Sequence, residues 1–193
     1  MTLIDKKNII KLKSTNIHFL FVCCWIFVSI LFQFHKTAFY QPVSVHQGAQ
    51  ADRASIAYNF YKTEMNIFLP RVMETGTFDG ITPSEFPLVS YVAAIFYKIF
   101  GFNDFWYRFT VWSFMGLGLW AAFNILITLG LEKYKSLILV FCWYFSTVLC
   151  YYTNNFLPDV VSLSFILLAL WQWFLLKKND KPTSKIFFTV FAT

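Results

Sequence analysis

Asp52 and Glu85 are the leading candidates for chemistry in this chain. Both lie in a polar segment, residues 35–104, that separates two long apolar runs. A carboxylate within hydrogen-bond reach of a hydroxyl group can take up its proton and so act as a general base. If the fold brings Asp52 and Glu85 together, they form an active site held against a membrane. The segment contains six of the ten acids of the chain: Asp52, Glu64, Glu74, Asp79, Glu85 and Asp104.

Each of the two acids also has a purely structural explanation. Aspartate is a favoured N-cap, and Asp52 stands where an amphipathic helix is predicted to begin. Glu85 precedes Pro87, and an acid in the first turn with proline just inside is an ordinary helix start. Spacing alone leaves the catalytic and the capping explanations open for both residues.

The helix predicted from about residue 52 to residue 65 has two different faces. At about 100° per residue, one stripe is polar and the opposite side is apolar. The polar stripe consists of Asp52, Ser55, Asn59 and Lys62, and the apolar side of Ala54, Ala57, Tyr58, Tyr61 and Met65. This pattern predicts that the polar stripe lines a water-filled cleft.

Besides Lys36 at its start, five cations accompany the acids in and next to this segment: Arg53, Lys62, Arg71, Lys98 and Arg108. Arginine and lysine beside carboxylates suit an anionic group such as a phosphate or a pyrophosphate. The alternative is that these side chains are solvated or paired with nearby acids.

Two further polar residues complete the candidate set. Asp159 is either a third site carboxylate or a helix cap, and His46 either contacts substrate or metal or has no chemical role.

The composition places these residues in a membrane protein. Hydrophobic residues make up 58% of the chain, aromatic residues 22% and charged residues only 13%, which is outside the usual range of soluble domains. The apolar runs predict an all-α, polytopic bundle of membrane helices. The predicted spans are 17–34, 105–131, 136–152 and 160–176, with a further one, 186–193, cut short where the sequence stops. We therefore expect the 193 residues to be the N-terminal part of one transmembrane domain.

Lysine placement predicts the orientation of the spans. Lysines gather before the first span, between residues 131 and 136, and after residue 176. These three groups fall on one side if the chain crosses at the four spans, which puts the N-terminus in the cytoplasm and residues 35–104 outside. The segment 86–100 is then a juxtamembrane helix that does not cross. Because most of the surplus positive charge is anchor charge, nucleic acid is not expected as a partner.

Several motifs of the outer segment, in this order, resemble the GT-C membrane glycosyltransferases. These are the run 46–61, Leu69-Pro70-Arg71, Glu85-Phe86-Pro87-Leu88 and the run 97–101, followed by Arg108 and Pro158-Asp159. The sequence is most similar to the bacterial dolichyl-phosphate-mannose-protein mannosyltransferase-like group, which includes lipopolysaccharide-core sugar and aminoarabinose transferases. One departure is that Glu85-Phe86-Pro87 replaces a basic residue before a proline pair found in some relatives, so a substrate contact inferred from those relatives does not transfer.

The resemblance implies a transferase of the bacterial inner membrane that moves a sugar from a polyprenyl-phosphate donor to a glycan, lipid or protein acceptor on the outer face, with inversion. It implies that Asp52 is the general base. Glu85 would organise the site, in some relatives through a divalent metal, and Asp159 would support the donor phosphate. Arg53, Asn59, Lys62, Arg71, Arg108 and His46 are the further candidates for substrate binding. A rival reading is a carrier or flippase for lipid-linked sugars, and a weaker one is a noncatalytic membrane subunit.

Overall fold

The computed structural model describes residues 16–73, 79–82, 85–179, 186–187 and 189–190. Its helices are α1 (Ile17–Leu31), α2 (Phe34–Thr37), α3 (Gln47–Lys62), α4 (Leu88–Phe100), α5 (Asp104–Thr128), α6 (Lys133–Tyr144), α7 (Thr147–Thr153) and α8 (Asp159–Asn179). The described residues form no strand. Their one extended pairing is an isolated antiparallel bridge between Arg71 and Ile81. The predicted all-α fold is confirmed.

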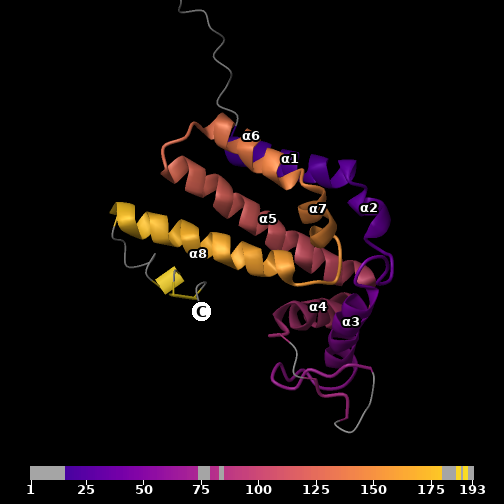
Figure 1. Cartoon of the computed structure of the whole chain (residues 1–193). Helices are drawn as coiled ribbons and strands as arrows, with labels where there is room; N and C mark the ends of the chain where they lie inside the picture. The colour runs from indigo at the N-terminus through magenta and orange to yellow at the C-terminus, as the bar shows by residue number, and fades with distance from the viewer. Residues whose placement is uncertain (1–15, 74–78, 83–84, 180–185, 188, 191–193) are drawn as a thin grey trace, which may run out of the picture.

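Helices α5 and α8 form the centre of the bundle and lie side by side (Figure 1). Both are long and apolar enough to cross a membrane, and α6 with α7 is a third candidate, so this is an integral membrane protein. Gly118 on α5 permits the close approach of α8. A Cβ atom at this position would lie 2.5 Å from Ser164 Oγ and 2.9 Å from Ser164 Cα.

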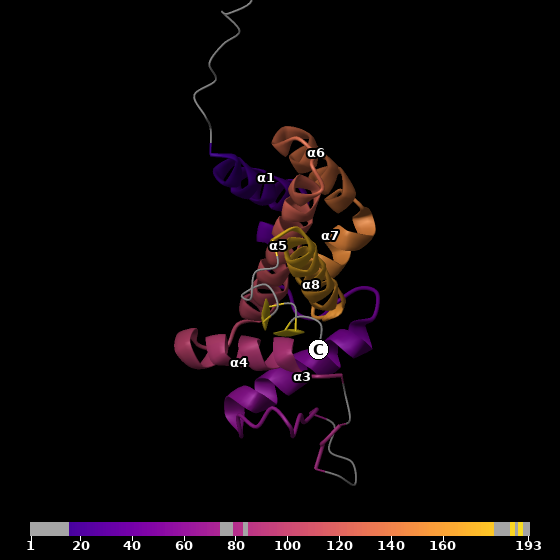
Figure 2. The same cartoon turned by 90° about the vertical axis from the view of Figure 1, so that its left-hand side faces the viewer.

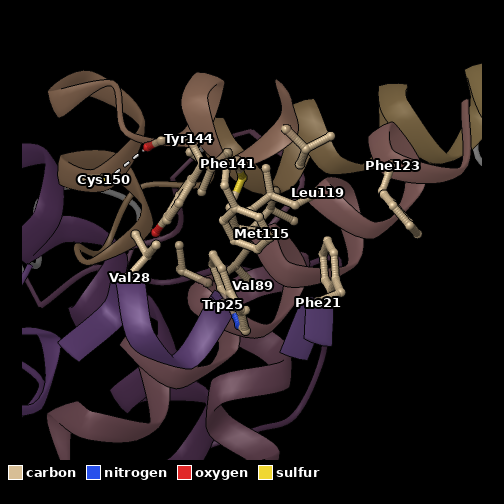
Figure 3. Packing of buried hydrophobic residues seen from close by; sticks show 14 of the residues in the cluster. Phe21, Trp25, Val28, Val89, Met115, Leu119, Phe123, Phe141, Tyr144 and Cys150 are labelled. Atoms are coloured by element: carbon tan, nitrogen blue, oxygen red, sulfur yellow. Dashed lines mark hydrogen bonds between the residues drawn. The ribbon is translucent and has the colours of Figure 1, made fainter. Parts of the chain in front are cut away.

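Helices α1 and α6 pack on α5 through an aromatic core (Figure 3). The Trp25 ring lies 5.1 Å from that of Trp112 and 4.9 Å from that of Tyr144, centroid to centroid. The Trp112 indole N–H donates to Ser29 Oγ at 2.8 Å, so α1 and α5 are also joined by a hydrogen bond. This core holds the second half of α1, after which the polar segment begins, against α5 and α6.

Two predicted spans are interrupted in the structure. The first ends at Leu31 and not at Phe34, because Gln33 adopts a left-handed conformation with φ 58° before the short α2. Residues 136–152 form two helices whose axes are bent by 78° at Phe145 and Ser146. The break frees backbone carbonyls, and Cys150 Sγ donates to that of Tyr144 at 3.1 Å. Of the span predicted from residue 186, half lies outside the described residues, namely residues 188 and 191–193.

Helices α3 and α4 lie together across one end of the bundle (Figures 1 and 2). Ile56 and Phe60 of α3 are buried with Ala94 of α4. On its other side α4 stacks on α5, with the Phe100 and Trp106 ring centroids 4.6 Å apart. At 13 residues, or about 20 Å, α4 is too short to cross a hydrocarbon core of about 30 Å.

The opposite end of the bundle carries exposed lysines. The first turns of α1 and α6 and the last turn of α8 lie at this end, away from α3 and α4 (Figure 1). Lys133 and Lys135 begin α6, Lys177 and Lys178 lie near the end of α8, and all four are exposed. This separation of a lysine-rich end from the α3–α4 end supports the orientation predicted from lysine placement, which stays a proposal.

Candidate active site

Asp52 lies inside α3 and not at its start. The helix begins at Gln47 and its N-cap is His46, in a left-handed conformation with φ 61° and no capping hydrogen bond from its side chain. The N-cap explanation of Asp52 is therefore wrong. The Asp52 side chain is exposed, and no hydrogen bond or ion pair of its carboxylate is found among the described residues. The group is thus accessible to a hydroxyl substrate.

Glu85 is held by Arg53 and not by the start of a helix. Helix α4 begins at Leu88 with Pro87 as its N-cap and has no acid in its first turn, so the helix-start explanation is also wrong. Arg53 Nε donates to Glu85 Oε1 at 2.6 Å, and Nη2 contacts the same oxygen. Arg53 Nη1 also donates to the Ala49 carbonyl at 2.9 Å. This pair joins the turn of α3 that carries Asp52 to the segment leading into α4.

A second contact between the same elements lies beneath the ion pair. Ser90 Oγ of α4 donates to the Arg53 carbonyl at 3.2 Å and lies 3.2 Å from the Tyr107 hydroxyl of α5. A small cavity here is lined by Arg53, Glu85, Tyr107 and Pro158, among others. The turn before α8 therefore reaches the Arg53–Glu85 pair, and Asp159, exposed at the first position of α8, is the next residue along.

The polar stripe of α3 does not line an open cleft along its length. Asn59 Nδ2 donates to the Arg71 carbonyl at 2.7 Å, and Ser55 Oγ accepts from the Met73 N–H at 3.3 Å. Both side chains therefore anchor the loop that follows α3. The prediction of a water-filled cleft is wrong at Asn59, where the loop backbone occupies the polar face, whereas Ser55 also lines an open cavity of about 410 Å³ with Met73 and Asp104.

Lys62 lies away from Asp52, and Arg71 belongs to the loop that folds back on α3. Lys62 ends α3, ten residues after Asp52, which is about 15 Å along the helix axis, and its Nζ lies 4.9 Å from the Tyr61 ring centroid. Arg71 Nη1 donates to the Asp79 carbonyl at 3.4 Å. Lys98 is exposed in the last turn of α4. The five cations thus do not form one cluster.

Arg108 is buried at the bundle end of the site, with 4% of its surface exposed. Its Nη1 donates to the Thr37 and Tyr40 carbonyls at 3.3 and 3.0 Å, and Nη2 donates to the Gln41 carbonyl at 3.2 Å. The guanidinium carbon lies 4.6 Å from the centroid of the Phe156 ring. Arg108 therefore fixes the chain between α2 and α3 against α5.

Gln50 is a site residue that the sequence did not single out for a role. Its amide is buried at 1% exposure and donates to the Val43 and Val45 carbonyls at 3.1 and 2.9 Å, while Oε1 accepts from the Phe156 N–H at 3.4 Å. These bonds hold the start of α3 to the turn before α8. His46 lies close by, with Nε2 3.4 Å from the Tyr152 hydroxyl of α7.

The described residues do not provide a metal site around Glu85. No group of three or more His, Cys, Asp or Glu side chains that could hold an ion occurs among them. The Glu85 carboxylate is instead occupied by a guanidinium, whose positive charge competes with a cation for the same oxygen.

The C-terminal part of the chain matches a known protein family. The model of the dolichyl-phosphate-mannose-protein mannosyltransferase family matches residues 83–193. The chain belongs to this family. The match covers Glu85 and α4 to α8, whereas α3 with Asp52 precedes it. No curated protein and no solved structure matches the chain. Family membership makes this protein a membrane glycosyltransferase of the GT-C type.

Proposed function

We propose that the protein transfers a sugar from a polyprenyl-phosphate donor to an acceptor hydroxyl on the outer face of the membrane, with Asp52 as the general base. The observation that carries the proposal is the Arg53–Glu85 pair. It ties the turn of α3 that carries the exposed Asp52 to the segment leading into α4, close to where the family match begins. Glu85 then acts as a positioning residue, because it orients Arg53 and the turn of α3 that carries the base.

The reaction balances with these groups. An Asp52 oxygen accepts the proton of the acceptor hydroxyl as the hydroxyl oxygen forms its bond to the anomeric carbon. The bond from that carbon to the donor phosphate oxygen breaks, and the lipid phosphate leaves with the electron pair. Attack opposite the leaving group inverts the anomeric centre, and a single catalytic carboxylate is enough for such a displacement. Glu85 therefore does not need to act as a second acid or base.

The leaving phosphate develops negative charge and needs a cation. Arg53 is adjacent to Asp52 in the chain, and Arg108 lies on the ring of Phe156, whose N–H donates to Gln50 of the same helix; we assign the stabilising charge to these two arginines. Asp159 begins α8 and His46 is the N-cap of α3, and we assign them supporting contacts with substrate. Lys62, Asn59 and Arg71 are assigned to holding the loop after α3.

The placement of charge supports transfer at the surface over transport through the bundle. Within α5 and α8 the charged residues fall in the first two turns or the last turn, namely Asp104, Arg108, Asp159, Lys177 and Lys178. A carrier is expected to place ionisable groups near the bilayer midplane. We place the lysine-rich end in the cytoplasm of a bacterium and the α3–α4 end in the periplasm.

Substitution of Asp52 by asparagine tests the proposal. The amide matches the carboxylate in shape and the residue is exposed in α3, so the fold is retained while proton acceptance is lost. We expect sugar transfer from a polyprenyl-phosphate donor in liposomes to fall by about 100-fold or more. The matched control is Glu64→Gln, an exposed acid just beyond α3, which should leave transfer unchanged. Turnover near the wild-type rate in Asp52→Asn would remove Asp52 from the role of base.

The sugar and the acceptor are identified by a separate experiment. Mass spectrometry of glycolipids and envelope glycans in a deletion strain shows which sugar is missing and which truncated product accumulates. The missing sugar names the donor, and the truncated product names the acceptor.

A further inference from the structure

An open cavity of about 410 Å³ lies beside α3, between the chain that leads into this helix and the turn from α4 to α5. Its volume is typical of small-molecule sites, which measure about 300–1,000 Å³. Its lining includes Ala51, Ser55 and Tyr58 of α3, together with Gln41, Phe102 and Asp104 from the two adjoining segments. None of its described lining residues lines the small cavity at the Arg53–Glu85 pair, so the two spaces are separate.

Asp104 is the one charged residue among the described residues that line the cavity. Its side chain is half-buried, and no hydrogen bond or ion pair of its carboxylate is found in the described part of the chain. The guanidinium of Arg108, one turn later in α5, is directed to the carbonyls of residues 37–41. The Asp104 carboxylate therefore suits a ligand that donates hydrogen bonds from hydroxyl or amino groups. A phosphate or an acidic ligand would bring like charges together.

Gln41 adds a second polar group to the cavity wall. Its side chain is exposed, and its amide makes no hydrogen bond within the described residues. Its backbone is held in place, because the Gln41 carbonyl accepts from Arg108 Nη2 at 3.2 Å. An amide both donates and accepts, so it complements a hydroxyl group of either polarity.

Phe102 provides an open aromatic ring beside these polar groups. Its ring centroid lies 5.1 Å from that of Tyr58 and 5.0 Å from that of Tyr97, with interplanar angles of 84° and 70°. Tyr97 is buried, whereas 49% of the Phe102 surface is exposed. The ring is thus fixed by two edge-to-face contacts and still available to a ligand. A fixed aromatic ring next to a carboxylate and an amide suits a sugar, which has apolar C–H faces and hydroxyl groups along its edge.

Asp52 lies between this cavity and the Arg53–Glu85 pair around the axis of α3. At about 100° per residue, the side chains of Ala51, Asp52 and Arg53 leave the helix in directions about 100° apart. Ala51 lines the cavity, whereas Arg53 pairs with Glu85. Ser55 of the cavity wall is about 60° from Asp52 around the axis, and its Oγ donates to the Asp52 carbonyl at 2.7 Å. The cavity therefore opens next to the Asp52 side chain, on the side away from Arg53.

We propose that this cavity binds the acceptor as a sugar ring without acidic groups. Hydroxyl or amino groups of the ring donate to Asp104 and bond to Gln41, and a C–H face of the ring lies on Phe102. That this sugar is the acceptor rests on the function proposed above, whereas binding of a sugar in the cavity does not. The acceptor is then a glycan or a glycolipid, and not a serine or threonine of a protein or a phosphate group.

The test is a direct binding measurement on the detergent-solubilised full chain by saturation-transfer NMR. The probes are the methyl glycosides of glucose, galactose, mannose, glucosamine and N-acetylglucosamine, with glucose 6-phosphate and a serine tripeptide as comparisons. The variants are Asp104→Asn, which removes the charge, and Phe102→Leu, which removes the ring. The matched controls are Asp79→Asn and Phe68→Leu, two exposed positions in the loop after α3 that do not line the cavity.

We expect at least one methyl glycoside to bind, with affinity reduced about tenfold or more in Asp104→Asn and severalfold in Phe102→Leu. Both controls should bind as the wild type does. Ala51→Leu fills the cavity from an exposed position of α3 and decides the matter if Asp104→Asn does not fold. The proposal is overturned if no glycoside binds, or if glycoside binding is the same in all variants. Tighter binding of glucose 6-phosphate or of the serine tripeptide than of every glycoside would also overturn it.

The outcomes separate this inference from the proposed function. Asp52→Asn should bind the methyl glycoside as the wild type does, although it does not transfer sugar. Asp52-dependent transfer with an acceptor KM that is unaltered in Asp104→Asn and Phe102→Leu would overturn the sugar site alone. Glycoside binding that follows the prediction, with no transfer from any lipid-linked donor, would overturn the proposed function alone.

Discussion

Replacing Arg108 by methionine should loosen the start of the outer segment. The guanidinium makes three hydrogen bonds to the carbonyls of Thr37, Tyr40 and Gln41 and lies on the Phe156 ring. Hydrogen bonds from a charged donor contribute about 1.5–3 kcal/mol each, and the cation–π contact about 1 kcal/mol. Tyr40 and Gln41 are exposed, so water replaces part of the lost bonding, and methionine avoids the cost of burying a charge. We therefore expect a net loss of about 2–3 kcal/mol in the free energy of unfolding.

Denaturant unfolding in mixed micelles measures this loss, and limited proteolysis locates it. Cleavage within residues 37–45 should increase in Arg108→Met, because this segment is held by Arg108 and by Gln50. The matched control is Lys98→Met, which removes an exposed cation from α4 and should change stability by less than about 0.5 kcal/mol. If Arg108→Met unfolds like the wild type and is cut no faster, the assignment of Arg108 as the residue that fixes this segment is refuted.

Two further experiments test the packing and the ion pair. Gly118→Ala should destabilise the protein by about 1–3 kcal/mol, because its Cβ would lie 2.9 Å from Ser164 Cα. The control is Gly116→Ala in the same helix, whose Cβ would meet only the Trp25 side chain, at 3.1 Å. It should lower the free energy of unfolding by less in the same assay. An equal loss in both variants would contradict the close approach of α5 and α8. A double-mutant cycle of Arg53→Met and Glu85→Gln should give a coupling of about 0.2–1 kcal/mol that falls with added salt, since Glu85 is 45% exposed. No coupling in that cycle would show that the pair does not position α3.

Much of the bundle follows from the apolar runs. The runs predicted at 105–131 and 160–176 correspond to α5 and α8 within a few residues, because long apolar stretches are bounded by polar residues such as Asp104 and Lys177. The break at Phe145 and Ser146 could not be predicted, since no proline or glycine marks it. The Tyr144 carbonyl accepts a hydrogen bond from Cys150 Sγ, and a hydropathy pattern does not predict this contact.

The roles of the candidate site residues stay predictions, and their contacts could not be predicted from the sequence. Asp52 and Glu85 were singled out by type and motif, but the pairing of Glu85 with Arg53, 32 residues away, depends on how α3 crosses α4. The start of α3 was placed too late because His46 begins the helix in a left-handed conformation without a side-chain cap. The stripe with Ser55 and Asn59 was read as solvent-facing, whereas the loop after α3 folds back on it.

The most direct test of the central claim is the stoichiometry of lipid phosphate release. The protein in liposomes is given a polyprenyl-phosphate sugar and an acceptor, and both transferred sugar and free lipid phosphate are counted. The account predicts one lipid phosphate released for each sugar transferred, with both products lost in Asp52→Asn and retained in Glu64→Gln. Movement of the intact lipid-linked sugar across the bilayer, with no lipid phosphate released, would contradict a transferase and establish a carrier.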